Sequence, residues 1–181
     1  MSTITFNNGD QVVHKVHGAG VVIGMEEKKL DGELLKFIRV HLTLKEGDIL
    51  IPFREGGPME LRKAVDEEGI KQLEEILQGK RKVVEPAEDG TPPDPISLIE
   101  TNDPFQIAQA IRALTDESKS NNFEKEEKDL LSMARMKLAG ELMLAKGISK
   151  AAALSFINRS IHGTAKFLKA AKKRRKKAAK E

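Results

Sequence analysis

The hydrophobic pattern of the chain changes its period once, close to Asp66, and this change divides the sequence into two parts. Before it, short runs rich in Val and Ile alternate with Gly and Asp, which is typical of strands joined by tight turns. After it, apolar residues recur every three or four positions, which is typical of amphipathic helices. This order predicts an α+β protein, with a small β domain followed by an all-α domain.

Four strands are predicted in the first part. They are "QVVHKV" (11–16), "GVVIGMEEKK" (20–29), "ELLKFIRVHLTL" (33–44) and "DILIPF" (48–53). Asp31-Gly32 separates the second and third runs, and this dipeptide is a strong hairpin signal because a type I′ turn needs positive φ at both central residues. Several short strands in so few residues favour a small closed barrel of the SH3 or Tudor type over residues 1–65.

The second part contains one predicted helix, a proline-rich segment and a helical domain. The first helix, over 66–79, follows or closes the barrel. Four prolines between Pro86 and Pro95 make 80–95 a linker or an ordered loop. The helical domain is expected over 96–165, and a basic tail follows over 166–181. Across the second part, helix starts are predicted from N-cap signals at Asp66, Asp103-Pro104 and Ser149. Helix ends are predicted from glycines at Gly79, Gly147 and Gly163.

The stretch "HKVHGAGVVIG" raises two chemical alternatives, a metal site and a phosphate-binding loop. His14 and His17 are three residues apart, which places them on opposite faces of a strand, and no cysteine or nearby carboxylate completes a zinc site. The glycines follow G-x-G-x-x-x-G and lead into a strand, not into a helix that could hold a pyrophosphate. A tight turn between two strands is therefore the preferred interpretation.

The sequence predicts no catalytic site, cofactor, metal or small-molecule substrate. It contains no Cys, no P-loop and no G-x-S-x-G motif. The N-terminal residues lack the features of a signal peptide, and no apolar run is long enough for a membrane span. We therefore expect a cytoplasmic protein that contacts macromolecules and no membrane.

Three features favour macromolecular contact, and each has a simpler alternative. The tail 166–181 carries nine Lys/Arg and one Glu, which suits phosphates or serves only as a solubilising arm. "DILIPF" contains Pro52 and fits an edge strand that could pair with a partner; alternatively, Ile49 and Ile51 face the core and Leu50 is an ordinary surface residue. In the helical domain, Lys128, Arg135 and Lys137 either follow phosphates or pair with Glu124, Glu127 and Glu141.

The sequence resembles the CarD/CdnL family of bacterial transcription factors. The pattern F-x-x-G-D-x-V-V-(x3)-H-G-x-G occurs from Phe6 to Gly20, followed by Gly32-Glu33 and Ile51-Pro52. In the second part, "NDPFQIAQAIRAL" is similar to the family's GDxxxVAEVVRDL, and "EKDLLSMARMKLAGELMLAK" to its EKxMLxxARxxLxxELALA. The transcription–repair coupling helicase shares the first domain, but this chain is short and has no P-loop.

The resemblance implies a Tudor-like domain that binds the RNA polymerase β subunit and a helical domain that binds double-stranded promoter DNA, stabilising the open complex. The resemblance assigns polymerase binding to Lys28 and to the edge Ile49, Leu50, Ile51 and Pro52, and we expect Arg39 to take part as well. It assigns DNA binding to Lys128, and we add Arg135, which lies near the same polar side of the predicted helix.

The sequence departs from the family where a Trp wedge and its basic neighbours are expected. The Trp position falls at Glu88, the basic positions within 90–93, and a further basic position at Glu117. DNA contact is therefore expected to move to the tail, at Lys172, Lys173, Arg174, Arg175, Lys176 and Lys177. The resulting expectation is a nucleoid-associated monomer that works with polymerase. The alternative is a freestanding nucleoid-type protein that binds DNA or RNA without it.

Overall fold

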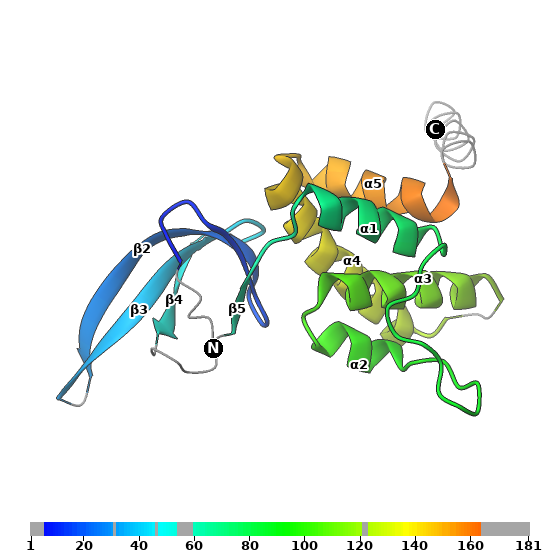
Figure 1. The fold of residues 1–181 in the computed structure, drawn as a ribbon, viewed down its shortest axis with the longest axis horizontal. Coiled ribbons are helices and arrows are strands. Elements are labelled where there is room, and N and C mark those ends of the chain that lie inside the picture. The colour runs from blue at the N-terminus through cyan, green and yellow to red at the C-terminus, as the bar shows by residue number, and fades with distance from the viewer. Residues whose placement is uncertain (1–5, 31, 46, 54–59, 121–122, 164–181) are drawn as a thin grey trace.

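The structure, a computed structural model, describes residues 6–30, 32–45, 47–53, 60–120 and 123–163 (Figure 1). It confirms the predicted fold class, because a five-stranded antiparallel sheet precedes five helices. The chain passes from the sheet domain to the helical domain between β5 and α1 (Figure 1). None of the described helices is long and apolar enough to cross a membrane.

The sheet has the strand order β4-β3-β2-β1-β5. Its strands are β1 (Gln11–His14), β2 (Gly18–Leu30), β3 (Glu33–Leu42), β4 (Asp48–Phe53) and β5 (Leu61–Lys63). In the part of the chain that the structure describes, β4 and β5 form the two ends of a curved sheet and do not pair with each other (Figure 1). The predicted hairpin joins β2 to β3, with Gly32 at φ 88°, whereas Asp31 lies outside the described residues.

A small apolar core lies on one face of the sheet. Val12, Val22, Ile38 and Val40 are almost fully buried in it. Gly20 lets β2 approach β3 closely, because a Cβ added there would lie 2.5 Å from the carbonyl oxygen of His41. Gly20 thus permits close strand approach and Gly18, at φ 83°, permits the turn, as predicted.

The helical domain contains the five described helices, including the first one, which was expected to follow or close the barrel. They are α1 (Glu67–Leu77), α2 (Pro95–Glu100), α3 (Pro104–Ser120), α4 (Lys125–Lys146) and α5 (Lys150–His162). The side chains of α1 at Leu73, Ile76 and Leu77 pack into the helical core. Because this burial occurs against the other helices, α1 belongs to the helical domain and not to the barrel.

The predicted helix boundaries are confirmed by hydrogen bonds at the helix ends. Asp66 accepts from Gly69 N at 2.8 Å, Asp103 from Phe105 N at 2.8 Å, and Ser149 from Ala152 N at 3.3 Å. These acceptors satisfy backbone N–H groups that have no partner within their own helix. Helix α5 ends at His162, and Gly163 is its C-cap residue with φ 72°.

The proline-rich segment is an ordered loop held against α3. The side-chain oxygen of Gln109 accepts from Val83 N and Val84 N at 2.7 and 3.0 Å, and its nitrogen donates to Val84 O at 2.7 Å. The side chain of one glutamine thus provides the hydrogen-bond partners that a neighbouring strand would provide in a sheet.

Helix α4 packs against both domains. Ala134, Leu138 and Leu142 face the helical core, while Gly140 faces the sheet domain. A Cβ added at Gly140 would lie 2.8 Å from Leu44 Cδ1 and 3.4 Å from Ala19 Cβ, so the missing side chain permits close packing.

Candidate interaction surfaces

Four of the six predicted polymerase-binding residues share one face of the sheet next to its β4 edge. Leu50 is directly opposite Arg39, and Pro52 is opposite Phe37, which is in turn opposite Glu26. Directly paired residues point to the same face, as do residues two apart on one strand. We call Lys28, Arg39, Leu50 and Pro52 the β4 surface.

Ile49 and Ile51 point to the opposite face of the same strand. Ile51 is 6% exposed and belongs to the sheet core, and Ile49 packs against that core. Leu50 is half-buried and Pro52 is exposed. The arrangement is therefore the alternative in which the two isoleucines face inward, and their side chains do not contribute to the β4 surface.

The sequence reasoning missed a carboxylate at the centre of the β4 surface. Glu26 forms an ion pair with Arg39 and lies 3.9 Å from the Lys28 ammonium nitrogen. It belongs to the alternating run "MEEKK", so its place beside Lys28 on the same face follows from strand periodicity. The two cations thus share one acidic partner.

The two predicted DNA-contacting residues of α4 have different environments. Lys128 is exposed, whereas Arg135 is half-buried and donates from Nη2 to the Thr115 hydroxyl oxygen on α3 at 3.1 Å. Burial also lowers the pKa of Arg135 below its ordinary value. Arg135 therefore contributes to the contact between α3 and α4, and Lys128 is better placed to meet a ligand.

The proposed helical ion pairs of Lys128, Arg135 and Lys137 do not occur among the described residues. Glu124 and Glu127 instead form a capping box at the start of α4, with Glu124 N donating to Glu127 Oε2 at 2.8 Å. Burial lowers the pKa of Lys137, and the nearby charge of Lys15 from the sheet domain adds to this effect. The positions Lys172, Lys173, Arg174, Arg175, Lys176 and Lys177 lie outside the described residues.

The two histidines organise the turn between β1 and β2. The Nδ1 atom of His14 accepts from Val16 N at 3.0 Å and His17 N at 3.1 Å, and its Nε2 lies 3.2 Å from Glu60. Burial, followed by the charge of His17, lowers the pKa of His14, although Glu60 opposes the shift. The acidic partner was missed because it is distant in sequence. The described residues contain no group of three metal-ligating side chains.

The junction between the domains contains an ion pair that was not predicted. The Arg62 guanidinium on β5 donates to both Glu141 carboxylate oxygens on α4, from Nη1 at 2.6 Å and Nη2 at 2.7 Å. Glu141 is 1% exposed. It is also the one charged residue in the apolar stretch "LAGELMLA", a signal that could have indicated a buried carboxylate with a remote partner.

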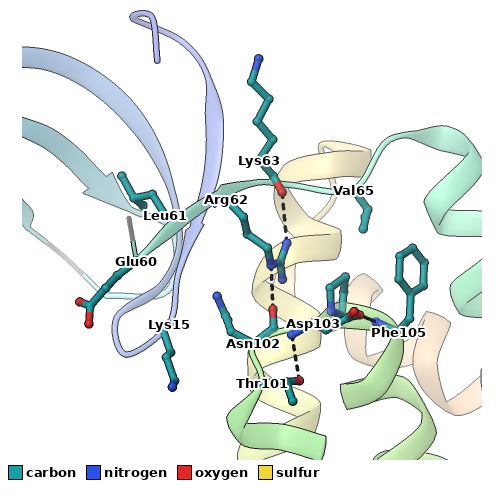
Figure 2. A pocket seen from close by; sticks show the side chains of 11 residues that line it. Lys15, Glu60, Leu61, Arg62, Lys63, Val65, Thr101, Asn102, Asp103 and Phe105 are labelled. Carbon is teal, nitrogen blue, oxygen red and sulfur yellow. Dashed lines mark hydrogen bonds between the residues drawn. The ribbon is translucent and has the colours of Figure 1, made fainter. Parts of the chain in front are cut away.

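A cavity of about 480 Å³ lies beside this ion pair, between β5 and the corner that joins α2 to α3 (Figure 2). Lys15, Glu60 and Lys63 line it from the sheet domain, and Asn102 and Phe105 from the helical domain. Arg62 crosses from one wall to the other and donates from Nε to Asn102 O at 2.7 Å (Figure 2).

Comparison with known protein families gives one consistent assignment. The model described as "CarD-like/TRCF RID domain" matches residues 6–56, and the model described as "CarD, C-terminal domain" matches residues 95–158. The two matches cover β1 to β4 of the sheet domain and most of the helical domain, in the expected order. The chain belongs to the CarD-like family.

A curated relative supports the same assignment. The chain is similar to the candidate transcription factor YdeB of Bacillus subtilis (strain 168), with 26% identity over 152 residues, covering 83% of this chain and 99% of the relative. The similarity therefore extends over nearly the whole relative and includes both domains.

The positions at which this CarD-like chain departs from the family pattern lie at its surface. Glu88 is exposed in the proline-rich loop, and Glu117 is exposed on α3. The loop turns next to Glu88, where Ala87 N donates to Thr91 O at 2.9 Å and Gly90 N to Ala87 O at 2.8 Å. A carboxylate at either position would repel a DNA phosphate.

Proposed function

We propose that this protein is a transcription factor that binds the RNA polymerase β subunit through the β4 surface and promoter DNA through its helical domain and basic tail. The observation that carries the proposal is the convergence of Lys28, Arg39, Leu50 and Pro52 on one face beside an edge strand. Membership of the CarD-like family and similarity to a candidate transcription factor support the same function.

The β4 surface has the chemistry of a protein-binding edge. Among the described residues, β4 pairs on one side only, with β3, and in this proposal the backbone groups of its other side pair with a strand from the partner. Leu50 and Pro52 supply apolar area, while Lys28 and Arg39 favour an acidic partner. In this proposal the partner is the β subunit.

DNA binding is assigned to Lys128 and to the tail cations at 172–177. Glu88 and Glu117 disfavour phosphate contact at the positions where the family pattern expects a wedge and basic residues. Contact between basic side chains and phosphates is independent of sequence and falls as salt rises. Holding DNA beside bound polymerase would stabilise the open complex.

The test of the polymerase interaction is co-purification of core polymerase with Leu50→Glu. The substitution should abolish recovery of polymerase but leave DNA binding unchanged, because it adds charge at the β4 surface alone. Ile96→Glu on α2 is the control, since Ile96 is an exposed apolar residue outside the β4 surface, and it should recover polymerase normally. Failure of the unsubstituted protein to recover polymerase would favour a freestanding nucleoid-type protein.

The test of the tail is deletion of 166–181 followed by a gel-shift titration with duplex DNA. The deletion should weaken binding and reduce its salt dependence, because each lost phosphate contact lowers the slope of log K against log salt by about 0.9. Unchanged DNA affinity would contradict the assignment of the tail.

A further inference from the structure

The ion pair at the domain junction contacts four separate segments of the chain. Arg62 belongs to β5, and its guanidinium reaches Glu141 on α4 and the carbonyl oxygen of Asn102 between α2 and α3. Glu141 also accepts from Val65 N, in the connection to α1, at 3.0 Å. One buried cluster therefore links the last strand, the interdomain connection, the α2–α3 corner and the central helix.

The polar groups of this cluster are hydrogen-bonded to one another, and this restricts the relative orientation of the two domains. The fork of Arg62 matches the two carboxylate oxygens, a geometry that holds only within a narrow range of positions. A tilt of the sheet domain would leave Glu141, at 1% exposure, without its counterion and without access to water. In some proteins, buried ion pairs favour one unique arrangement while adding little to net stability.

The backbone at the α2–α3 corner depends on the same arginine. Asn102 has φ 62°, a left-handed conformation that is uncommon outside glycine. Its carbonyl oxygen accepts the Nε proton of Arg62 in this conformation, as Figure 2 shows. The corner is therefore held in position relative to β5 by a hydrogen bond and not by apolar packing, because the cavity lies beside it.

Contacts on the other side of the junction complete a two-sided attachment. Gly140 admits Leu44 and Ala19 against α4, and Gln11 donates from Nε2 to Leu144 O at 3.0 Å. Close packing sets the distance between α4 and the sheet. Contacts along a single line would still permit the sheet domain to rotate about that line. The Arg62–Glu141 pair lies to one side of that line and prevents the rotation.

We propose that Arg62 and Glu141 are positioning residues that hold the sheet domain and the helical domain in one fixed orientation. The consequence for function rests on the proposed roles of the two domains: the β4 surface and Lys128 are then presented at a constant separation and angle. Polymerase binding at one end would thereby place DNA contacts at the other without a further ordering step.

The test measures distances between two spin labels in the full chain. The protein has no cysteine, so Lys36→Cys on β3 and Lys71→Cys on α1 introduce one label in each domain at exposed positions. The parent should give a single narrow distance distribution. Arg62→Ala should lose it and give a broad one, whereas Lys63→Ala, an exposed neighbour on the same strand, should keep it.

A second variant separates orientation from folding. Arg62→Lys keeps the positive charge but not the fork, so it should also broaden the distribution while circular dichroism shows an intact fold. A narrow distribution in both Arg62 variants would overturn the proposal. Because neither polymerase nor DNA is present, this result does not depend on the proposed function.

A further measurement tests the functional consequence. Arg62→Ala should still co-purify with core polymerase through the unchanged β4 surface, but lose its effect on the lifetime of the open complex. An unchanged lifetime with a broadened distribution would refute the functional role of the fixed orientation and leave the assignment of Arg62 as a positioning residue intact.

Discussion

Lys28 and Arg39 of the sheet domain lie on its outer face, whereas Arg112 and Arg135 of the helical domain turn into contacts between helices. Arg112 pairs with Asp116 at 2.6 Å and donates to Leu77 O and Ile161 O, near the ends of α1 and α5. These carbonyl groups lie near helix C-termini, where no N–H group of the same helix can donate to them. In the helical domain Arg112 and Arg135 thus serve contacts within the fold, whereas Lys128 is exposed.

The geometry of the two kinds of element explains this difference. In the sheet, side chains alternate between faces, so a charge on the outer face reaches solvent or a partner. A helix packed on several sides has a narrower exposed stripe, and long cations near its edge fold back onto neighbours. A charged residue is therefore a more direct indicator of an interaction surface in the first domain than in the second.

The largest effect should come from removing the buried charge at the junction. Glu141→Ala leaves the Arg62 guanidinium and the Val65 N–H without their acceptor, so the free energy of unfolding should fall by about 3–5 kcal/mol. Urea titration measures this change. Glu117→Ala, an exposed carboxylate on α3, is the control and should change stability by less than about 0.5 kcal/mol. Equal stability of the two variants would show that Glu141 has no special role inside the fold.

Substitutions at the neighbouring β4 residues Ile51 and Leu50 should have different effects, because Ile51 points into the core and Leu50 points outward. Ile51→Ala should lower the free energy of unfolding by about 2–5 kcal/mol, because it opens a cavity in a small core. Leu50→Ala should cost less than about 1 kcal/mol but weaken polymerase binding. Thermal unfolding and polymerase co-purification, measured on both variants, test the division. A larger loss of stability for Leu50→Ala would contradict the assigned faces.

Arg135 and Lys128 test the same distinction on one helix. Arg135→Met should lower the free energy of unfolding by about 1–2 kcal/mol through loss of its bond to Thr115, and leave the salt dependence of DNA binding unchanged. Lys128→Gln should do the reverse, reducing the slope of log K against log salt by about 0.9 at constant stability. If Arg135→Met alone reduced the slope, Arg135 would be the DNA contact.

The smallest effect concerns pH and the β1–β2 turn. The folded state favours neutral His14, whose Nδ1 accepts two backbone N–H groups, so its pKa is lowered from the ordinary 6.5. The unfolded chain then binds the proton first, and the free energy of unfolding should decrease as the pH falls from about 6.5 toward the lowered value. Above that range the contribution is complete.

His14→Asn keeps a side-chain acceptor without a titrating ring, so it should flatten this part of the stability profile. Urea unfolding between pH 5 and pH 7.5 measures it, with His41→Asn, an exposed ring beside Asp48, as the control. An unchanged profile in His14→Asn would assign the dependence to another group.

Local signals in the sequence predicted most of the fold. Strands β1 to β4, the hairpin and the caps at Asp66, Asp103 and Ser149 each depend on residues a few positions apart. The short elements β5 and α2 were missed, because three residues become a strand only by pairing with β1, and six residues after a proline-rich loop carry little periodicity.

The interaction surfaces were predictable to a lesser extent. Strand alternation could have placed Lys28, Arg39 and Glu26 together, since their register is set by one hairpin. Arg62 and Glu141 are 79 residues apart, and no local pattern links them. The inward turn of Arg135 likewise depends on Thr115, which lies on another helix.

Helix α4 contacts both domains at once. One side of it packs in the helical core and another side packs against the sheet, so the angle between these two sides about the helix axis must be kept. Inserting a single residue between Ala134 and Gly140 would turn one side by about 100° relative to the other. Length changes in such chains should therefore be excluded from this segment and be found in the loop 80–95 and beyond α5.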